Sequence, residues 1–153
     1  MDGKEKVKAW LKSYKTWKRF IQNTDRTIQR LVAEMNQKPT PAAVRYDMAP
    51  GSTGGLHASQ EERFLERKEE LQEQITELQA RTRAARKNVL LLDTAIASLD
   101  PLDAQLIQCR NIDGMTWTRT ALEVGYSESS CRARYDNMVK ELACMLFGEG
   151  LEA

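Results

Sequence analysis

Residues 116–142 have the sequence TWTRTALEVGYSESSCRARYDNMVKEL, a pattern that predicts two helices joined by a tight turn. The hydroxyl of Thr116 can cap the first helix, and Gly125 can adopt the positive φ that ends it. Ser127 can then cap the second helix through its side-chain oxygen. We therefore expect a short supporting helix, followed by a longer one that ends near residue 147.

The predicted second helix has one apolar face and one polar face. Its apolar positions Cys131, Tyr135, Met138 and Leu142 are four, three and four residues apart, as on the buried face of a helix. The other face is free to meet a partner, and a recognition helix presents its N-terminal side chains to the major groove. The pattern favours DNA binding, although structural helical hairpins share it.

A more specific indication comes from residues 111–127, NIDGMTWTRTALEVGYS. From residue 99 to 142 the chain resembles the helix-turn-helix of the fourth conserved region of bacterial sigma factors. The same segment more closely resembles phage late transcription regulators of the RinA/ArpU type, and this likeness extends, more loosely, over most of the chain. This resemblance implies a phage or prophage regulator that activates late genes and contacts host RNA polymerase. Two positions depart from the family pattern, because Thr120 replaces an aliphatic residue and Arg134 lies near an apolar position.

Docking of such a helix on double-stranded DNA assigns roles to exposed side chains. Base edges are expected to meet Ser129, Ser130, Arg132 and Ala133. Phosphates are expected to meet Thr116, Thr118 and Arg119. Ser127 and Arg134 complete the predicted DNA-binding set, while Trp117, Leu122 and Tyr126 are expected to be structural. Serine hydroxyls can form hydrogen bonds with several bases and arginine prefers guanine, so these residues do not predict the operator sequence.

The net charge of +1 is distributed unevenly. Residues 1–38 carry ten Lys/Arg and four Asp/Glu, whereas residues 100–153 carry five and nine. The negative charge of the C-terminal domain argues against DNA binding, because DNA-binding domains gain affinity by neutralising phosphates. The objection weakens if the basic N-terminal segment folds back beside that domain. Auxiliary phosphate contacts are then expected from Lys4, Lys6, Lys8 and Lys12.

Two heptad patterns predict long helices in the first part of the chain. Mostly apolar residues alternate at spacings of three and four from residue 7 to 35, and again from residue 64 to 99. Between them, residues 38–59 hold three prolines and three glycines, which break helices. This segment is predicted to be a connection, either disordered or reserved for a partner.

The chain is thus predicted to be all-α, with two domains. Residues 1–99 are expected to form a long antiparallel helical hairpin (coiled coil), and residues 100–153 a sigma-like helix-turn-helix domain. Two helices alone bury little apolar surface, so either the C-terminal domain docks on the hairpin or the chain forms a homodimer.

Other functions are not expected. The longest aliphatic run is four residues, 89–92, far below the ~20 of a membrane span, and the first residues lack the apolar core of a signal peptide. We expect a protein of the bacterial host cytoplasm. Three cysteines without a CxxC pair, and one histidine, predict no metal site. No nucleophile with a base and no phosphate-binding glycine motif is visible, so neither enzymatic activity nor a cofactor is expected.

Two alternatives stay open at this point. The small subunit of a phage terminase also joins a helix-turn-helix to helical oligomerisation segments, and it would form rings larger than a tetramer. A coiled-coil adaptor or inhibitor that uses a DNA-binding fold to bind protein would show no salt-dependent affinity for DNA.

Overall fold

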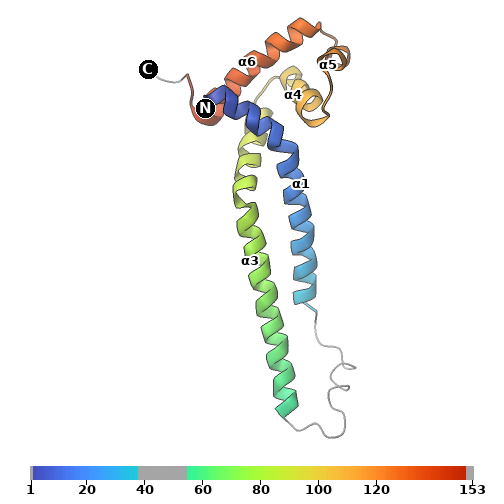
Figure 1. Ribbon diagram of the computed structural model, residues 1–153, viewed down its shortest axis with the longest axis vertical. Coiled ribbons are helices and arrows are strands. Elements are labelled where there is room, and N and C mark those ends of the chain that lie inside the picture. Colours follow the sequence, from blue (N-terminus) through green and yellow to red (C-terminus); the bar gives the residue numbers. More distant parts are fainter. Residues whose placement is uncertain (1, 38–54, 151–153) are drawn as a thin grey trace. The chain divides into compact units, whose positions relative to one another are not determined.

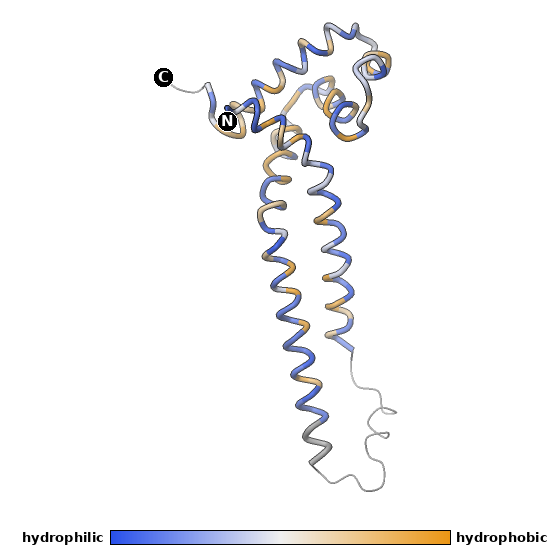
Figure 2. The backbone as a smooth tube through the Cα atoms, viewed as in Figure 1, coloured by the Kyte–Doolittle hydropathy of each residue, from blue (hydrophilic) through white to orange (hydrophobic). Residues whose placement is uncertain are grey.

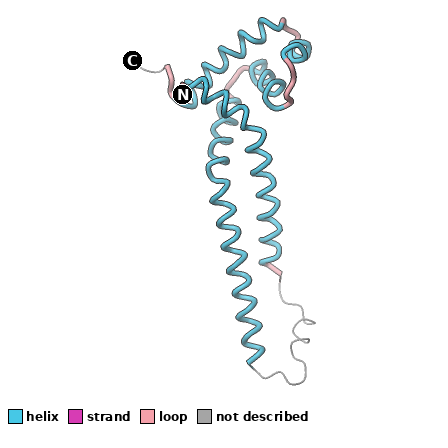
Figure 3. The backbone as a smooth tube through the Cα atoms, viewed as in Figure 1, coloured by secondary structure: helices cyan, strands magenta, loops and turns pink. Residues whose placement is uncertain are grey.

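The computed structural model describes residues 2–37 and 55–150, with side chains described from residue 60 in the second range. Within these ranges the chain is helical and contains no strand (Figure 3). In chain order the elements are α1 (Gly3–Met35), α3 (Gly55–Ala97), α4 (Pro101–Ile107), the π-helical turn η1 (Gln108–Ile112), α5 (Trp117–Val124) and α6 (Glu128–Phe147) (Figure 1). The prediction of an all-α chain is confirmed for this part of the sequence.

The start of α3 differs from the prediction of a connection over residues 38–59. The helix already begins at Gly55, so the last five residues of that segment are helical. Glycine is penalised in a helix interior but tolerated at a helix start, and Gly55 therefore marks a beginning rather than a break. Residues 38–54 lie outside the described residues.

The chain divides into two compact units, residues 22–83 and residues 1–21 together with 84–153. The division passes through both long helices, along which hydrophobic residues recur between hydrophilic ones (Figure 2). The domain boundary at residues 99 and 100 is drawn from the sequence pattern alone and stays a prediction.

The unit of residues 22–83 has a small core between α1 and α3. Leu31, Leu71 and Ile75 are buried there, and an ion pair joins Arg67 to Glu34 at 2.7 Å. Thr82, which interrupts the second heptad pattern, is fully buried, and its hydroxyl donates to the carbonyl of residue 78 at 3.2 Å. Burial of this polar residue is tolerated because its hydrogen bond is made.

The unit of residues 1–21 and 84–153 has a core formed by residues from both the N-terminal and the C-terminal part of the chain. Buried residues come from α1 (Val7, Leu11, Tyr14), α3 (Leu92, Ala95), the end of α4 (Ile107) and α6 (Met138, Val139, Leu142, Ala143). The ring of Trp10 meets that of Phe147 edge to face at a centroid distance of 5.1 Å. The N-terminal part of α1 and the C-terminal half of α6 therefore share one core.

Candidate nucleic-acid interface

The turn between α5 and α6 has the capping interactions that the sequence predicts. Thr116 caps α5 by accepting from the backbone N–H of Arg119 at 3.2 Å, and Gly125 ends the helix with a φ of 78°. Ser127 caps α6 by accepting from the N–H of Ser130 at 3.2 Å. These three residues fix the angle at which α6 leaves the turn.

The two faces of α6 also divide as the pattern predicts. Cys131, Met138 and Leu142 are buried, whereas Ser129, Ser130, Arg132 and Ala133 are exposed. The four exposed residues lie within the first six positions of the helix, where the free backbone N–H groups also favour an anion. The predicted base-contacting residues are therefore together on one accessible surface.

Arg132 is held in place by its neighbours on α5 and α6. Its guanidinium donates to Glu128 at 2.7 Å and lies 5.5 Å from the ring centroid of Trp117. A second guanidinium, that of Arg110, lies 4.3 Å from the same ring, and Tyr135 meets the ring edge to face at 5.3 Å. This aromatic and basic cluster restricts the directions in which Arg132 can extend.

Sequence reasoning missed Arg110. It lies in η1, where Asp113 N–H donates to the carbonyl of Gln108 at 2.8 Å, and its own guanidinium donates to the carbonyl of Met115. The π-helical turn brings Arg110 onto Trp117, seven residues further along the chain. No heptad or capping pattern in the sequence indicates such a contact.

Arg134 pairs with carboxylates on or beside another helix, whereas the carboxylate partner of Arg132 lies on α6 itself. It donates to Asp103 at 2.8 Å and pairs with Asp100 at 3.5 Å, both on or beside α4. The hydrogen bond to Asp103 and the nearby carboxylate charges raise the pKa of Arg134, so the guanidinium stays charged. The side chain of Arg134 thus ties α6 to α4.

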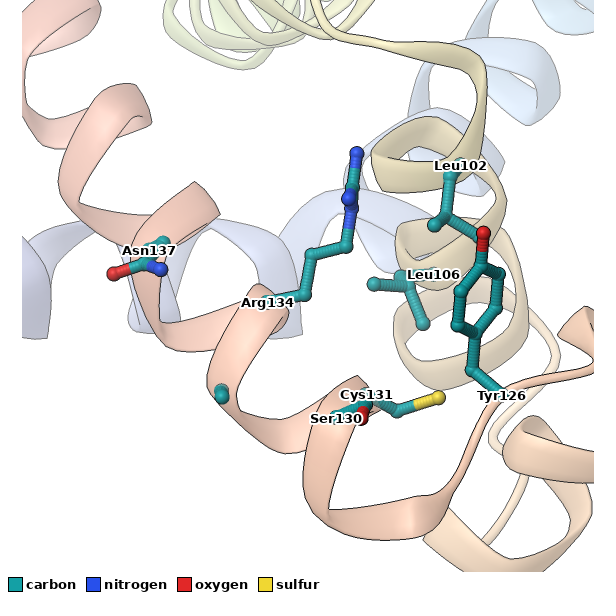
Figure 4. A pocket seen from close by; sticks show the side chains of 8 residues that line it. Leu102, Leu106, Tyr126, Ser130, Cys131, Arg134 and Asn137 are labelled. Atoms are coloured by element: carbon teal, nitrogen blue, oxygen red, sulfur yellow. The ribbon is translucent and has the colours of Figure 1, made fainter.

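A hollow of about 370 Å³ lies between α4 and α6. Figure 4 shows Arg134 extending from α6 toward α4 and Tyr126 standing at the turn. The residues that line the hollow are Leu102, Leu106, Tyr126, Ser130, Cys131, Ala133, Arg134 and Asn137. Two of the predicted base-contacting residues, Ser130 and Ala133, therefore border a partly apolar depression.

The predicted phosphate-contacting residues differ in how available they are. The hydroxyl of Thr116 serves as the cap of α5, and that of Thr118 donates to Glu128 at 3.4 Å. The side chain of Arg119 is exposed and has no ion pair among the described residues. Of these three side chains, Arg119 is the most available for a phosphate.

Two residues predicted to be structural are exposed. Leu122 is 80% exposed and Tyr126 is 56% exposed, so the prediction is wrong for both, whereas Trp117 is partly buried. The buried position on α5 is Thr120, with none of its surface exposed. The helix therefore presents Thr120 to the core and turns Leu122 toward solvent.

The basic side chains in residues 4–19 of α1 lie in the same unit as this interface. Lys4, Lys6, Lys8 and Lys12 are all exposed, and the ammonium of Lys6 lies over the ring of Phe147 at 5.4 Å from its centroid. Lys18 lies over Tyr14 at 4.6 Å and is 3.8 Å from Asp93. Tyr14 itself donates to Asp93, and burial is the main cause that raises its pKa.

Cys109 and Cys131 are buried free cysteines, and Cys144 is partly buried. Burial raises the pKa of Cys109, which keeps its thiol protonated. Within the described residues, no set of three or more His, Cys, Asp or Glu side chains converges as metal ligands would. No described helix combines the length and the hydropathy of a membrane span.

Comparisons with protein-family models, curated proteins and solved structures found no match to this chain.

Proposed function

We propose that this chain is a sequence-specific DNA-binding transcription regulator of the phage or prophage type that activates late genes. In this proposal α5 and α6 are the helix-turn-helix, and α1 and α3 form the antiparallel hairpin that carries it. The phage origin and the late-gene role rest on the family resemblance of residues 99–142.

The observation that carries the proposal is the exposed N-terminal surface of α6. The exposed residues at the start of α6 are Ser129, Ser130, Arg132 and Ala133, and the opposite face of the helix is buried. A helix of this kind fits the major groove, because its small residues allow close approach while the arginine reaches the N7 and O6 of guanine. Arg132 is the residue on which discrimination between base pairs would mainly depend.

Selection of duplex DNA from a randomised pool tests the proposal. The wild type is expected to enrich one sequence class, and Arg132→Ala is expected to lose about 1–3 kcal/mol of discrimination at one base pair. Lys140→Ala is the matched control, because it removes one exposed cation from the same helix two turns further on. Recovery of random sequence by the wild type, or equal effects of the two variants, would remove α6 as a reading element.

A protein-binding adaptor is the second candidate, and a specific observation favours it. Leu122 and Tyr126 are exposed, and Tyr126 borders the partly apolar hollow between α4 and α6. Residues 100–153 also carry a net charge of −4, which suits a basic protein partner better than phosphates. An adaptor would enrich no sequence in the selection, and its salt-dependent affinity for duplex DNA would be absent.

A further inference from the structure

Five basic side chains form a stripe along the N-terminal part of α1. Lys4, Lys8, Lys12, Lys15 and Arg19 are spaced four, four, three and four residues apart, which places them on one face of a helix. All five are exposed, and none has an ion pair among the described residues. We call this set the basic stripe.

The basic stripe differs from the basic residues predicted from the sequence. Lys6 belongs to another face and contacts Phe147, while Lys18 is already paired with Asp93. Lys15 and Arg19 extend the stripe beyond the predicted Lys4 to Lys12. The structure thus separates the basic side chains of α1 that are occupied from those that are available.

The helix that carries the stripe is anchored in the core it shares with α6. Val7 and Leu11 are fully buried in the same cluster as Leu142. At Gly3, an added Cβ would lie 3.2 Å from the Cβ of Ala143, so the start of α1 closely approaches the end of α6. The stripe therefore belongs to the same compact unit as the α5–α6 pair.

We propose that the basic stripe binds the phosphate backbone of duplex DNA that flanks the site contacted by α6. This inference rests on the proposed function and supplies what that surface lacks. Residues 100–153 are acidic, and Asp136 lies on the exposed side of α6. Adding residues 1–21 and 84–99 to that segment gives the unit fourteen Lys/Arg and twelve Asp/Glu, so the cations of α1 turn its net charge positive.

The dimensions of the stripe suit a duplex. Fifteen residues separate Lys4 from Arg19, a length of about 22 Å in a helix. Along the axis of duplex DNA the phosphates of one strand advance about 3.4 Å each, so the length of the stripe matches the rise of about six base pairs. If all five cations neutralise a phosphate, they contribute about 4.5 to the slope of log affinity against log salt.

A membrane surface would need a different helix. A helix that lies on a bilayer inserts an apolar face next to its basic face, and the apolar face of α1 in this unit is buried in the protein core. Phosphate groups held in a rigid row therefore suit the stripe better than lipid headgroups.

The test compares two triple variants of the full chain that remove equal charge. Lys8→Gln/Lys12→Gln/Lys15→Gln changes the stripe, and Arg26→Gln/Arg30→Gln/Lys68→Gln changes exposed cations in the unit of residues 22–83. Binding to a labelled duplex of random sequence is measured by fluorescence anisotropy over a range of KCl concentrations. The stripe variant is expected to lower the slope by about 2.7, and the control variant by much less.

Several outcomes would overturn the inference. Equal loss in both variants would mean that net charge alone acts, and an unchanged slope in the stripe variant would mean that the stripe is not in contact with DNA. Binding of the wild type to phosphatidylserine vesicles without binding to the duplex would assign the stripe to lipid. Melting curves of both variants should match the wild type, because all six side chains are exposed.

The inference and the proposed function can fail separately. If the wild type enriches no sequence but the stripe variant loses its salt-dependent affinity, the stripe stands and sequence-specific regulation falls. If sequence enrichment succeeds and the stripe variant keeps the wild-type slope, regulation stands and the stripe falls. A shorter duplex that covers only the enriched site should reduce the difference between wild type and stripe variant, since the flanking phosphates are missing.

Discussion

Replacing Thr120 by valine is expected to stabilise the protein. Thr120 lies on α5 with none of its surface exposed. Its Oγ1 is the only buried side-chain nitrogen or oxygen in the described residues that lacks a hydrogen-bond partner. Its backbone N–H donates normally to the carbonyl of Thr116 at 2.9 Å, so the helix itself is intact. Burial therefore removes this hydroxyl from water without giving it a hydrogen bond in the protein.

The expected gain follows from this environment. An unsatisfied buried polar group costs about 1–3 kcal/mol. Valine has nearly the same shape and a similar helix propensity, and the methyl group that replaces the hydroxyl contributes about 0.8 kcal/mol when buried. We therefore expect Thr120→Val to raise the free energy of unfolding by about 1–2 kcal/mol. For a chain of 153 residues this corresponds to a rise in Tm of about 2–4 °C per kcal/mol.

Urea and thermal unfolding, followed by circular dichroism, measure the effect. Thr118→Val is the matched control, because Thr118 is exposed on the same helix, and its change should stay within about 0.5 kcal/mol. Thr120→Ser keeps the hydroxyl, loses the methyl group and should be less stable than the wild type. If Thr120→Val unfolds at the same urea concentration as the wild type, or earlier, the hydroxyl has a partner and the argument is wrong.

Two further substitutions test the turn and the aromatic cluster, and a third tests the contact between α4 and α6. Gly125→Ala should lower the free energy of unfolding in urea by about 1–2 kcal/mol, because a residue with a Cβ is strained at a φ of 78°. The strain lies in the backbone, since no neighbouring atom lies within 4 Å of the added Cβ. Gly125→Asn should cost less, and equal costs for the two variants would contradict this reasoning. Tyr135→Phe keeps the ring but loses the hydrogen bond to Asn111 at 3.1 Å, a loss of about 1 kcal/mol at neutral pH. Burial raises the pKa of Tyr135 above its ordinary 10.0, so the stability that the protonated hydroxyl contributes is complete below pH 10 and is lost as the pH rises through the folded-state pKa. The phenylalanine variant should lose less stability over that pH range. Unfolding at several alkaline pH values measures the difference. Arg134→Ala should lower the Tm because it leaves the carboxylate of Asp103 without its partner, and an unchanged Tm would show that this ion pair does not hold α4 to α6.

Local sequence signals predicted the C-terminal helices well. A capping threonine, a glycine with a positive φ and a capping serine each act within three or four residues, so the sequence alone contains the interaction. The heptad pattern likewise predicted that Val7 and Tyr14 would be buried. Leu11 lies outside that pattern, yet it is fully buried, because residues of α6 as well as α3 pack against this part of α1.

The candidate site was predicted less completely, because its details depend on contacts distant in sequence. The periodicity of α6 separated exposed Arg132 from buried Cys131, but it could not indicate that Arg134 would reach Asp103 on α4, 31 residues away in sequence. Leu122 was predicted to have a structural role because it is apolar, yet it is exposed, and α5 turns Thr120 toward the core instead. Composition identified the basic N-terminal segment, but which lysines are occupied depends on the positions of Phe147 and Asp93.

The ion pair of Arg134 limits how α6 can contact DNA. If its guanidinium turned toward a base, the carboxylate of Asp103, whose side chain is only 9% exposed, would be left buried without its partner. Base contact from the start of α6 therefore falls to Arg132 and to the small side chains beside it, which together offer one bidentate donor. A single such contact gives some discrimination but little affinity, because most of the affinity of such proteins comes from phosphates. In the proposed function Arg119 offers one phosphate contact, so most of the affinity must come from cations outside residues 100–153, and the basic stripe of α1 is an unpaired set of this kind among the described residues of the unit.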